Sequence, residues 1–471
     1  MAWVPSAATQ FSLDIWSQIS KQCDRNTLRQ LATHEVHSVV RQSALPYLFK
    51  KLHFHAFNLL RYEGRSLTST PEEHEDLFNA KSHQSSQRFM QLPLSRFARY
   101  VRTWTYEGFF YSDEDPETAV TSMIYRYNQE MWPFFAENLA CYTGLTNLSF
   151  RRVVIDERAV ISLNKLANLR DLSFSEVDIT SAINLGSPHI RLISLQYIPF
   201  NFLSAFIVGA CATLGTLRVH VSKEDHRALH DVLEHCPVLN QLAITLTDEE
   251  DSVPSHSLSI TACPNLTEYI GPGYYAGVIA GRPVREIELN QCPRPQYFAT
   301  EETDWLEVCG RGTVPVEVFW IHDFPTFAIP DLFPVIMEKF PLLTDLQLTF
   351  YAYTMADDND PEDIEISNQV HYLSIIHDVS TGKYEVPGTL RYLEILLCEE
   401  YEIHPTITLA QVVDRIQSSE KFTNLDCLIL GNKESYQCWN KDETGVWSMI
   451  QYGEDDLEGG DNDGDGDGSD G

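Results

Sequence analysis

A histidine pair near the start of the chain has a spacing close to that of a zinc site. His-Glu-Val-His at 34–37 is one residue short of H-E-x-x-H, in which two imidazoles share one helical face and bind the metal. The three-residue spacing found here falls within an expected helix. A pair of surface histidines is the simpler interpretation.

Two further stretches carry residue types that a site could use. His226, His230 and Glu234 follow one another at four-residue intervals, so they could share a helical face and hold a zinc ion. A solvated outer helix explains the same spacing. The segment Gly-Pro-Gly-Tyr-Tyr-Ala-Gly at 271–277 misses the G-x-G-x-x-G nucleotide-binding spacing by one position and follows no βαβ pattern.

The acidic end of the sequence resembles the first half of a calcium-binding loop. Asp461, Asp463 and Asp465 occupy positions 1, 3 and 5 of an EF-hand loop, and Gly466 occupies position 6. The bidentate glutamate expected at position 12 would be residue 472, so we interpret the stretch as a disordered acidic tail. No nucleophile elbow or phosphate-binding lysine loop occurs either. The sequence therefore predicts no enzyme, no catalytic residue, no cofactor and no metal.

Charge is distributed unevenly along the 471 residues. Residues 1–110 carry 13 Lys/Arg and 9 Asp/Glu, whereas the remaining residues carry 21 and 58. So acidic a body repels phosphate backbones and anionic lipids, which argues against nucleic acid and membrane surfaces as partners. A neutral or basic protein partner fits this charge.

The cysteines and apolar runs favour a cytoplasmic or nuclear protein. The ten cysteines include no C-x-x-C pair, lie in apolar contexts and are expected to be reduced and buried. Residues 1–20 show no secretory signal pattern. The uncharged run 192–217 is long enough to span a bilayer, but it contains polar residues, Pro199 and glycines. A buried repeat segment, with an outer helix at 201–214, is the preferred interpretation.

One phrase, L-x-x-L-x-Φ with Φ apolar, recurs along the body. Its first five copies start 24, 23, 22 and 25 residues apart, within the period of leucine-rich repeats. The copies are Leu145-Leu148-Phe150, Leu169-Leu172-Phe174, Leu192-Leu195-Tyr197, Leu214-Leu217-Val219, Leu239-Leu242-Ile244, Leu266-Tyr269-Gly271, Val284-Ile287-Leu289, Leu343-Leu346-Leu348, Leu390-Leu393-Ile395 and Leu425-Leu428-Leu430. Each phrase predicts a short strand that cannot bury its leucines alone, so neighbouring repeats must stack.

The segments between the phrases fit outer helices and loops. Residues 225–235 predict a helix that Cys236-Pro237 terminates before the next strand. Residues 314–321 predict an additional strand in the first wide gap, and 97–110 predict the first strand of the array. The sequence thus divides into a helical segment at 8–52, a connecting segment with a polar loop at 53–96, a repeat solenoid at 97–452 and the acidic tail at 453–471.

The front of the chain predicts short helices with an apolar stripe. Asp24 can cap a helix. The apolar residues that follow recur at helical spacing, at Leu28, Leu31, Ala32, Val36, Val39 and Val40. A third element at 44–49, broken near Pro46, leads into the strand-like Leu-His-Phe-His-Ala-Phe. A unit of this size buries little apolar surface. We therefore expect it to dock on the repeat solenoid or on another protein.

These residues resemble an F-box, and more narrowly the F-box family expanded in mushroom-forming (basidiomycete) fungi. The resemblance rests on Phe11-Ser12-Leu13-Asp14-Ile15, on the apolar stripe, on Ala44-Leu45-Pro46-Tyr47-Leu48-Phe49, and on Arg99-Tyr100-Val101-Arg102-Thr103 ahead of the repeats. Ser12 replaces the family's proline, Asp14 its glutamate, and the Val-Cys-Arg signature is absent. The fold class is thus α/β, with a three-helix F-box, an irregular leucine-rich-repeat solenoid and a disordered acidic tail.

The resemblance implies a function in the ubiquitin conjugation pathway. In that family the box binds the Skp-type adaptor of a cullin ubiquitin ligase, and the repeats bind a protein target. Carried over by position, the adaptor-binding residues are Phe11, Ser12, Asp14, Ile15, Ile19, Leu28 and Leu31. The alternative is a repeat protein that binds partners without a ligase, in which a degenerate box caps the solenoid.

Overall fold

The computed structural model describes most of the chain in two compact units. The first unit comprises Met1–Glu249 with Thr261–Cys263, and the second comprises Glu250–Ile260 with Pro264–Gly471. The described residues are 13–33, 36–55, 83, 86–87, 89–108, 119–179, 189–196, 207–246, 258–291, 305–325, 329–351, 372–398, 408–433 and 436–450. The predicted acidic tail, most of the polar loop expected at 65–90 and residues 201–206 of the outer helix expected at 201–214 lie outside them.

The first unit opens with a three-helix segment, formed by α2 (Leu13–Lys21), α3 (Arg25–Leu31) and α4 (Ser38–Leu48). Asp24 caps α3 as predicted, because its carboxylate accepts the backbone N–H of Thr27 at 2.7 Å. The predicted stripe does not form one helix. Helix α3 ends at Leu31. A separate helix, α4, then continues through Pro46 to Leu48. A proline two residues before the helix end costs one backbone hydrogen bond, which a short helix tolerates.

Parallel strands follow one another through the first unit. They run in the order β1 (Lys51–His55), β2 (Thr103–Glu107), β3 (Asn147–Arg151), β5 (Asp171–Ser175), β7 (Leu192–Gln196), β8 (Thr216–Val221) and β9 (Gln241–Leu246). A separate ribbon pairs β4 (Val154–Ile155) with β6 (Asp178–Ile179). We expected the array to begin near residue 97, but β1 already pairs with β2.

The predicted phrases form these strands and place their apolar residues inside. Leu148 and Phe150 of β3 pair in register with Leu172 and Phe174 of β5, and all four side chains are at most 2% exposed. Side chains on a strand alternate between two faces, so the intervening residues lie on the open face. Each fully buried leucine or phenylalanine stabilises the fold by roughly 1.5–3 kcal/mol relative to an exposed one.

The third phrase begins two residues earlier than predicted. Leu172 pairs with Ile193 and Phe174 with Leu195, so the repeat reads Ile190-x-x-Ile193-x-Leu195. These three side chains are at most 1% exposed. A shift of two residues keeps the alternation of faces, which is why leucine spacing alone could not distinguish the two frames.

A repeated backbone contact stacks the strands. The carbonyl one residue before each strand accepts two consecutive N–H groups from the next repeat. Arg102 O, for example, accepts from Thr146 N at 2.8 Å and Asn147 N at 2.9 Å. The same pattern recurs at Lys50, Thr146, Arg170, Arg191 and Gly215. This contact fixes the start of each strand relative to the start of the preceding strand. The phrases of successive repeats therefore pair in register.

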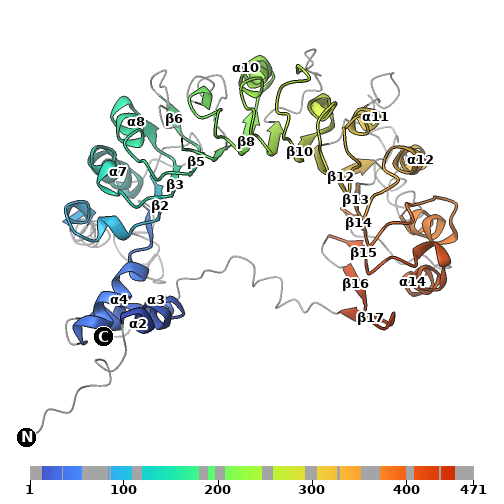
Figure 1. Cartoon of the computed structure of the whole chain (residues 1–471), viewed down its shortest axis with the longest axis horizontal. Coiled ribbons are helices and arrows are strands. Elements are labelled where there is room, and N and C mark those ends of the chain that lie inside the picture. Colours follow the sequence, from blue (N-terminus) through green and yellow to red (C-terminus); the bar gives the residue numbers. More distant parts are fainter. Residues whose placement is uncertain are drawn as a thin grey trace, which may run out of the picture. The chain divides into compact units, whose positions relative to one another are not determined.

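The helices that follow β2 in the first unit lie on one side of its strands (Figure 1). They are α7 (Ala119–Asn138), α8 (Glu157–Leu163) and α10 (His226–Leu233), with 3-10 turns η1 (Ala98–Tyr100), η2 (Leu139–Cys141) and η4 (Lys223–Asp225). Helix α10 confirms the helix predicted at 225–235. Aromatic rings fill the space between α7 and the first strands. Phe54 stacks on Tyr106 at 4.6 Å between ring centroids, and Trp104 lies 5.1 Å from Phe135.

The second unit continues the same design with its own strands. They are β10 (Glu268–Pro272), β11 (Glu286–Gln291), β12 (Val318–Pro325), β13 (Asp345–Tyr351), β14 (Tyr392–Leu397) and β15 (Cys427–Asn432), all parallel, then the antiparallel β16 (Tyr436–Lys441) and β17 (Trp447–Ile450). The strand predicted at 314–321 is confirmed as β12, with Val316, Phe319 and Ile321 buried.

Short helices again lie on one side of the strands of this second unit (Figure 1). They are α11 (Trp305–Cys309), α12 (Ile329–Lys339) and α14 (Leu409–Ser418), with η5 (Gly273–Val278) and η9 (Glu420–Phe422). The near-match to a nucleotide loop at 271–277 spans the end of β10 and η5. Among the described residues, no helix is long and apolar enough to cross a membrane.

Candidate functional site

Helix α2 exposes isoleucines and buries serines. Ile15 is 45% exposed and Ile19 is 41% exposed, and the four-residue spacing places both on one face. On the inward side, Ser20 is fully buried and its hydroxyl lies 3.1 Å from that of Ser43 on α4. The Ser17 hydroxyl lies 3.0 Å from the Tyr47 hydroxyl, also on α4. This polarity is the reverse of that of an ordinary amphipathic surface helix.

Small and polar side chains let α2 and α4 approach closely. Ser43 also donates to the carbonyl of Val40 at 2.6 Å, so both buried hydroxyls have partners. Val40 and Ala44 are nearly fully buried beside them. Hydroxyl contacts therefore join α2 to α4, and Ile15 and Ile19 keep a large part of their side chains at the surface.

The predicted adaptor-binding residues divide into three groups. Asp14, Ile15 and Ile19 lie on the exposed side of α2. Leu31 is half-buried, and Leu28 is only 6% exposed. Leu28 is therefore a core residue of the three-helix segment, and its place in the adaptor-binding set stays a prediction. The remaining two, Phe11 and Ser12, lie outside the described residues.

The three-helix segment joins the strands without a linker. Helix α4 ends at Leu48 and β1 begins at Lys51. Between them, Phe49 stacks on Phe97 with ring centroids 4.8 Å apart and planes only 7° from parallel. The Lys50 carbonyl accepts the N–H groups of Arg102 and Thr103, as the equivalent carbonyl does in later repeats. The last residues of the predicted box are therefore part of the first repeat.

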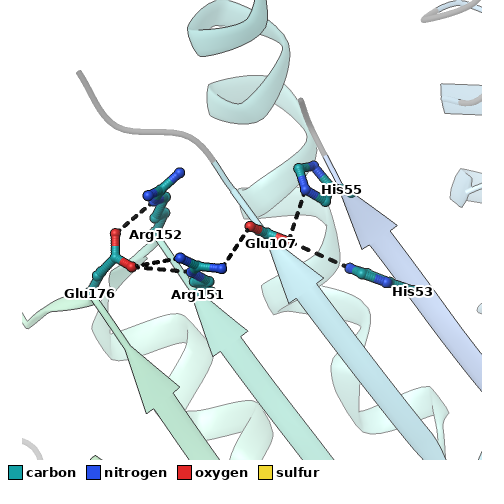
Figure 2. Close-up of polar contacts among 6 residues, drawn as sticks. All are labelled: His53, His55, Glu107, Arg151, Arg152 and Glu176. Carbon is teal, nitrogen blue, oxygen red and sulfur yellow. Dashed lines mark hydrogen bonds and ion pairs between the residues drawn. The ribbon is translucent and has the colours of Figure 1, made fainter. Parts of the chain in front are cut away.

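A charged network lies beyond this joint, at the far ends of the first strands (Figure 2). The Glu107 carboxylate lies 3.0 Å from His55 Nε2 and 3.7 Å from His53 Nε2, both on the neighbouring strand β1. On its other side lies Arg151, whose guanidinium is 3.4 Å away. Burial alone would raise the pKa of Glu107, but hydrogen bonds from the two histidines and the charge of Arg151 lower that pKa well below its usual range.

The network continues along the strand ends to Glu176. Its carboxylate pairs with Arg151 at 2.9 Å and with Arg152 at 2.6 Å. These contacts lower the pKa of Glu176 although partial burial opposes them. Arg152 and Glu176 occupy equivalent turns of successive repeats, with φ of 53° and 52°. The network thus links four repeats, and its acids and bases compensate one another, which favours a structural role.

This network was not predicted from the sequence. The alternating histidines of Leu-His-Phe-His-Ala-Phe were visible as a strand pattern, but their partner Glu107 lies on another strand far along the chain. Only the pairing of β1 with β2 brings them together. A pattern search could have noted that His-x-His places both rings on one face of a strand.

Among the described residues, the other stretches that carry histidines and acidic side chains do not form a metal site. His230 is only 9% exposed, His226 is half-buried and Glu234 is exposed, so the three do not share the solvated face expected of them. Two residues of the 34–37 stretch, His34 and Glu35, lie outside the described part. Within the described residues, no group of three or more histidine, cysteine or acidic side chains could hold a metal ion. The cysteines described there are all free thiols.

The strands and their phrases define the class of this protein. Apolar residues at positions 1, 4 and 6 of successive repeats are buried in one layer, on in-register parallel strands with outer helices. This is a leucine-rich-repeat fold. Repeat proteins of this kind commonly bind partners on the extended surface that their stacked repeats create.

Comparisons with known proteins give matches among solved structures, and we describe three of them, each at low sequence identity. No protein-family model and no curated protein matches the chain. An internalin of Listeria monocytogenes is similar at 12% identity, over 63% of this chain and 76% of that one, with a TM-score of 0.29. The mouse RP105/MD-1 complex matches at 11% identity, over 68% and 59%, with a TM-score of 0.22. The leucine-rich-repeat ectodomain of the receptor kinase GASSHO1/SCHENGEN3 from Arabidopsis thaliana matches at 11%, over 73% and 39%, with a TM-score of 0.21.

Proposed function

We propose that this chain is the substrate-recognition subunit of a Skp–cullin–F-box type ubiquitin ligase. The three-helix segment docks on the Skp-type adaptor, and the repeats bind a protein target in the cytoplasm or nucleus. The observation that carries the proposal is the reversed polarity of α2, which exposes Ile15 and Ile19 and buries Ser20. Apolar side chains that remain largely exposed on one face of a helix fit a docking surface.

In this function the chain catalyses no step itself. It holds a target lysine near a ubiquitin donor, so that a bimolecular encounter becomes an intramolecular one at high effective concentration. A rigid connection between the docking segment and the target-binding surface raises this effective concentration, because it limits the volume that the bound target explores. The absence of a linker between α4 and β1 supports such a connection.

Co-purification with a Skp-type adaptor tests the proposal. Ile15→Asp with Ile19→Asp introduces two charges at the proposed contact and should abolish adaptor binding, because a buried unpaired carboxylate costs several kcal/mol. The matched control is Ile161→Asp with Val238→Asp, since these side chains are 48% and 42% exposed on other parts of the same unit. The control pair should bind like the wild type.

Two outcomes would contradict the proposal. If the wild-type protein folds but does not co-purify with the adaptor, the proposed ligase function is ruled out. Loss of adaptor binding in the control pair as well would show that the assay reports general surface damage. Circular dichroism of all variants separates a lost contact from unfolding, since the two isoleucines contribute little to packing inside the unit.

A second candidate function is a repeat scaffold whose degenerate box acts as a cap. The stacking of Phe49 on Phe97 and the shared backbone contact at Lys50 favour it, because both tie the three-helix segment to the first strands. A cap protects the exposed end of a repeat stack from solvent. Under this alternative, Ile15→Asp with Ile19→Asp leaves partner binding by the repeats unchanged and no adaptor is ever bound.

A further inference from the structure

The open face of the second unit carries carboxylates between apolar side chains. Strand pairing aligns two accessible rows across β10 to β15. The first row is Glu268, Glu286, Val318, Asp345, Tyr392 and Cys427, and the second is Ile270, Glu288, Trp320, Gln347, Glu394 and Ile429. Neither row contains lysine or arginine at any of these described positions. We call these two rows the acidic-apolar face.

The side chains of this face are partly accessible to solvent. Glu286 is exposed, and the others are half-buried. The next row along the strands is covered, with Thr349 3% and Leu396 8% exposed. A half-buried row of mixed acidic and apolar side chains offers a partner both charge and apolar contact area.

The carboxylates of the first row repel one another. Burial and the neighbouring charges of Glu268, Glu317 and Asp345 raise the pKa of Glu286. On the second row, His322 Nε2 lies 3.3 Å from Glu288, and the Tyr392 hydroxyl donates to Glu394 at 2.5 Å. Arg285 pairs with Glu317 just outside the rows. The face therefore retains a net negative charge that an incoming cation would relieve.

We propose that the acidic-apolar face binds a lysine- or arginine-rich segment of a protein partner that also carries an apolar side chain. Charge complementarity selects the cations, and Val318, Ile270 and Trp320 offer the apolar contact. Like-charge contacts disfavour acidic segments, which gives specificity as well as affinity. The inference rests on the proposed function for one point only, namely that the segment belongs to the ligase target.

A synthetic peptide tests the proposal on the full chain. The probe is a fluorescent peptide in which lysine and serine alternate around one central tryptophan, and its control has glutamate in place of every lysine. Anisotropy should report binding of the lysine peptide and none of the glutamate peptide. Raising the salt from about 0.1 M to about 1 M shortens the Debye length from roughly 10 Å to roughly 3 Å and should weaken binding.

A matched pair of variants places the binding on this face. Glu286→Gln with Glu288→Gln should weaken binding of the lysine peptide roughly two- to thirtyfold, because two ion pairs with the peptide are lost. Glu307→Gln with Glu338→Gln removes the same charge from the outer helices α11 and α12, where both side chains are exposed. This control pair should bind like the wild type.

Three results would overturn the proposal. Equal losses in the two variant pairs would mean that the overall negative charge, and not this face, attracts the peptide. Equal binding of lysine and glutamate peptides would mean that charge plays no part, and no binding at about 0.1 M salt would mean that the face is not a docking surface. The adaptor co-purification uses the same preparations, so a chain that loses the adaptor and keeps the peptide separates the two proposals.

Discussion

Two short helices of the first unit place their apolar side chains on opposite sides. Helix α10 buries Leu229, Val232 and Leu233, all fully removed from solvent. Helix α2 buries Ser20 and exposes Ile15 and Ile19. The repeat array thus uses its apolar residues for its own stability, whereas the three-helix segment keeps two of them at the surface. Helical periodicity alone cannot distinguish the two cases, because it reports a face and not what covers that face.

The largest effect is expected where α10 packs on the strands. Leu229→Ala removes a fully buried side chain and should lower the free energy of unfolding of the first unit by about 2–5 kcal/mol, since a cavity adds to the lost burial. Urea denaturation followed by circular dichroism measures the change. A loss below 1 kcal/mol would mean that the outer helices contribute little, and the contrast with α2 would weaken.

A smaller effect is expected at the turn after β2, where the first strands meet the helices. A Cβ on Gly108 would approach the Arg152 carbonyl oxygen to 2.3 Å and the Val153 side chain to 2.8 Å. Gly108→Ala should therefore cost about 1–3 kcal/mol of stability, the range of an overpacked site. The control is Gly388→Ala, because no atom lies within 4 Å of its added Cβ. Thermal unfolding measures the two midpoints. Equal decreases for Gly108→Ala and Gly388→Ala would mean that the backbone next to Gly108 does not exclude a Cβ.

The charged network is expected to contribute less, and only above acidic pH. Because the pKa of Glu107 is lowered on folding, its stabilising contribution is present above the unfolded value, about 4.3, and is lost as the pH falls below it. Glu107→Gln should lose about 1 kcal/mol at neutral pH.

The same variant should lose less stability than the wild type when the pH falls. Urea midpoints at neutral pH and at about pH 3 measure both effects. Glu137→Gln is the matched control, because its ion pair with Arg158 is solvent-exposed on both sides. A pH dependence that is identical in wild type and Glu107→Gln would mean that the carboxylate is not stabilised by His53, His55 and Arg151.

The repeats could be predicted from sequence because their signal is local and periodic. Each phrase specifies a strand and its buried face within six residues, so even the degenerate strand with Phe319 and Ile321 was identified. The frame at Ile190 was missed, since isoleucine and leucine satisfy the phrase in two overlapping frames. The break between α3 and α4 was missed because the apolar stripe continues across it at helical spacing.

The site was only partly predictable. The resemblance predicts Ile15, Ile19 and Leu28 for the adaptor-binding set, and the structure shows the two isoleucines exposed and Leu28 buried. Burial depends on which helix packs on which, and that information lies in the Ser20–Ser43 contact between α2 and α4. The Glu107 network depends in the same way on strand pairing between residues distant in sequence.

The smallest stability effect is expected at Ile15, and there the contrast between the two helices is most informative. Ile15→Ala should change the free energy of unfolding by no more than about 0.5 kcal/mol, because an exposed side chain loses little packing on truncation. The same substitution should weaken adaptor binding, since apolar anchors at the centre of an interface commonly contribute more than about 1 kcal/mol. Urea denaturation and titration with purified adaptor measure the two quantities on one preparation. A destabilisation as large as that of Leu229→Ala would mean that α2 uses Ile15 for its own packing. Both helices would then bury their apolar side chains for stability, and the contrast between them would be lost.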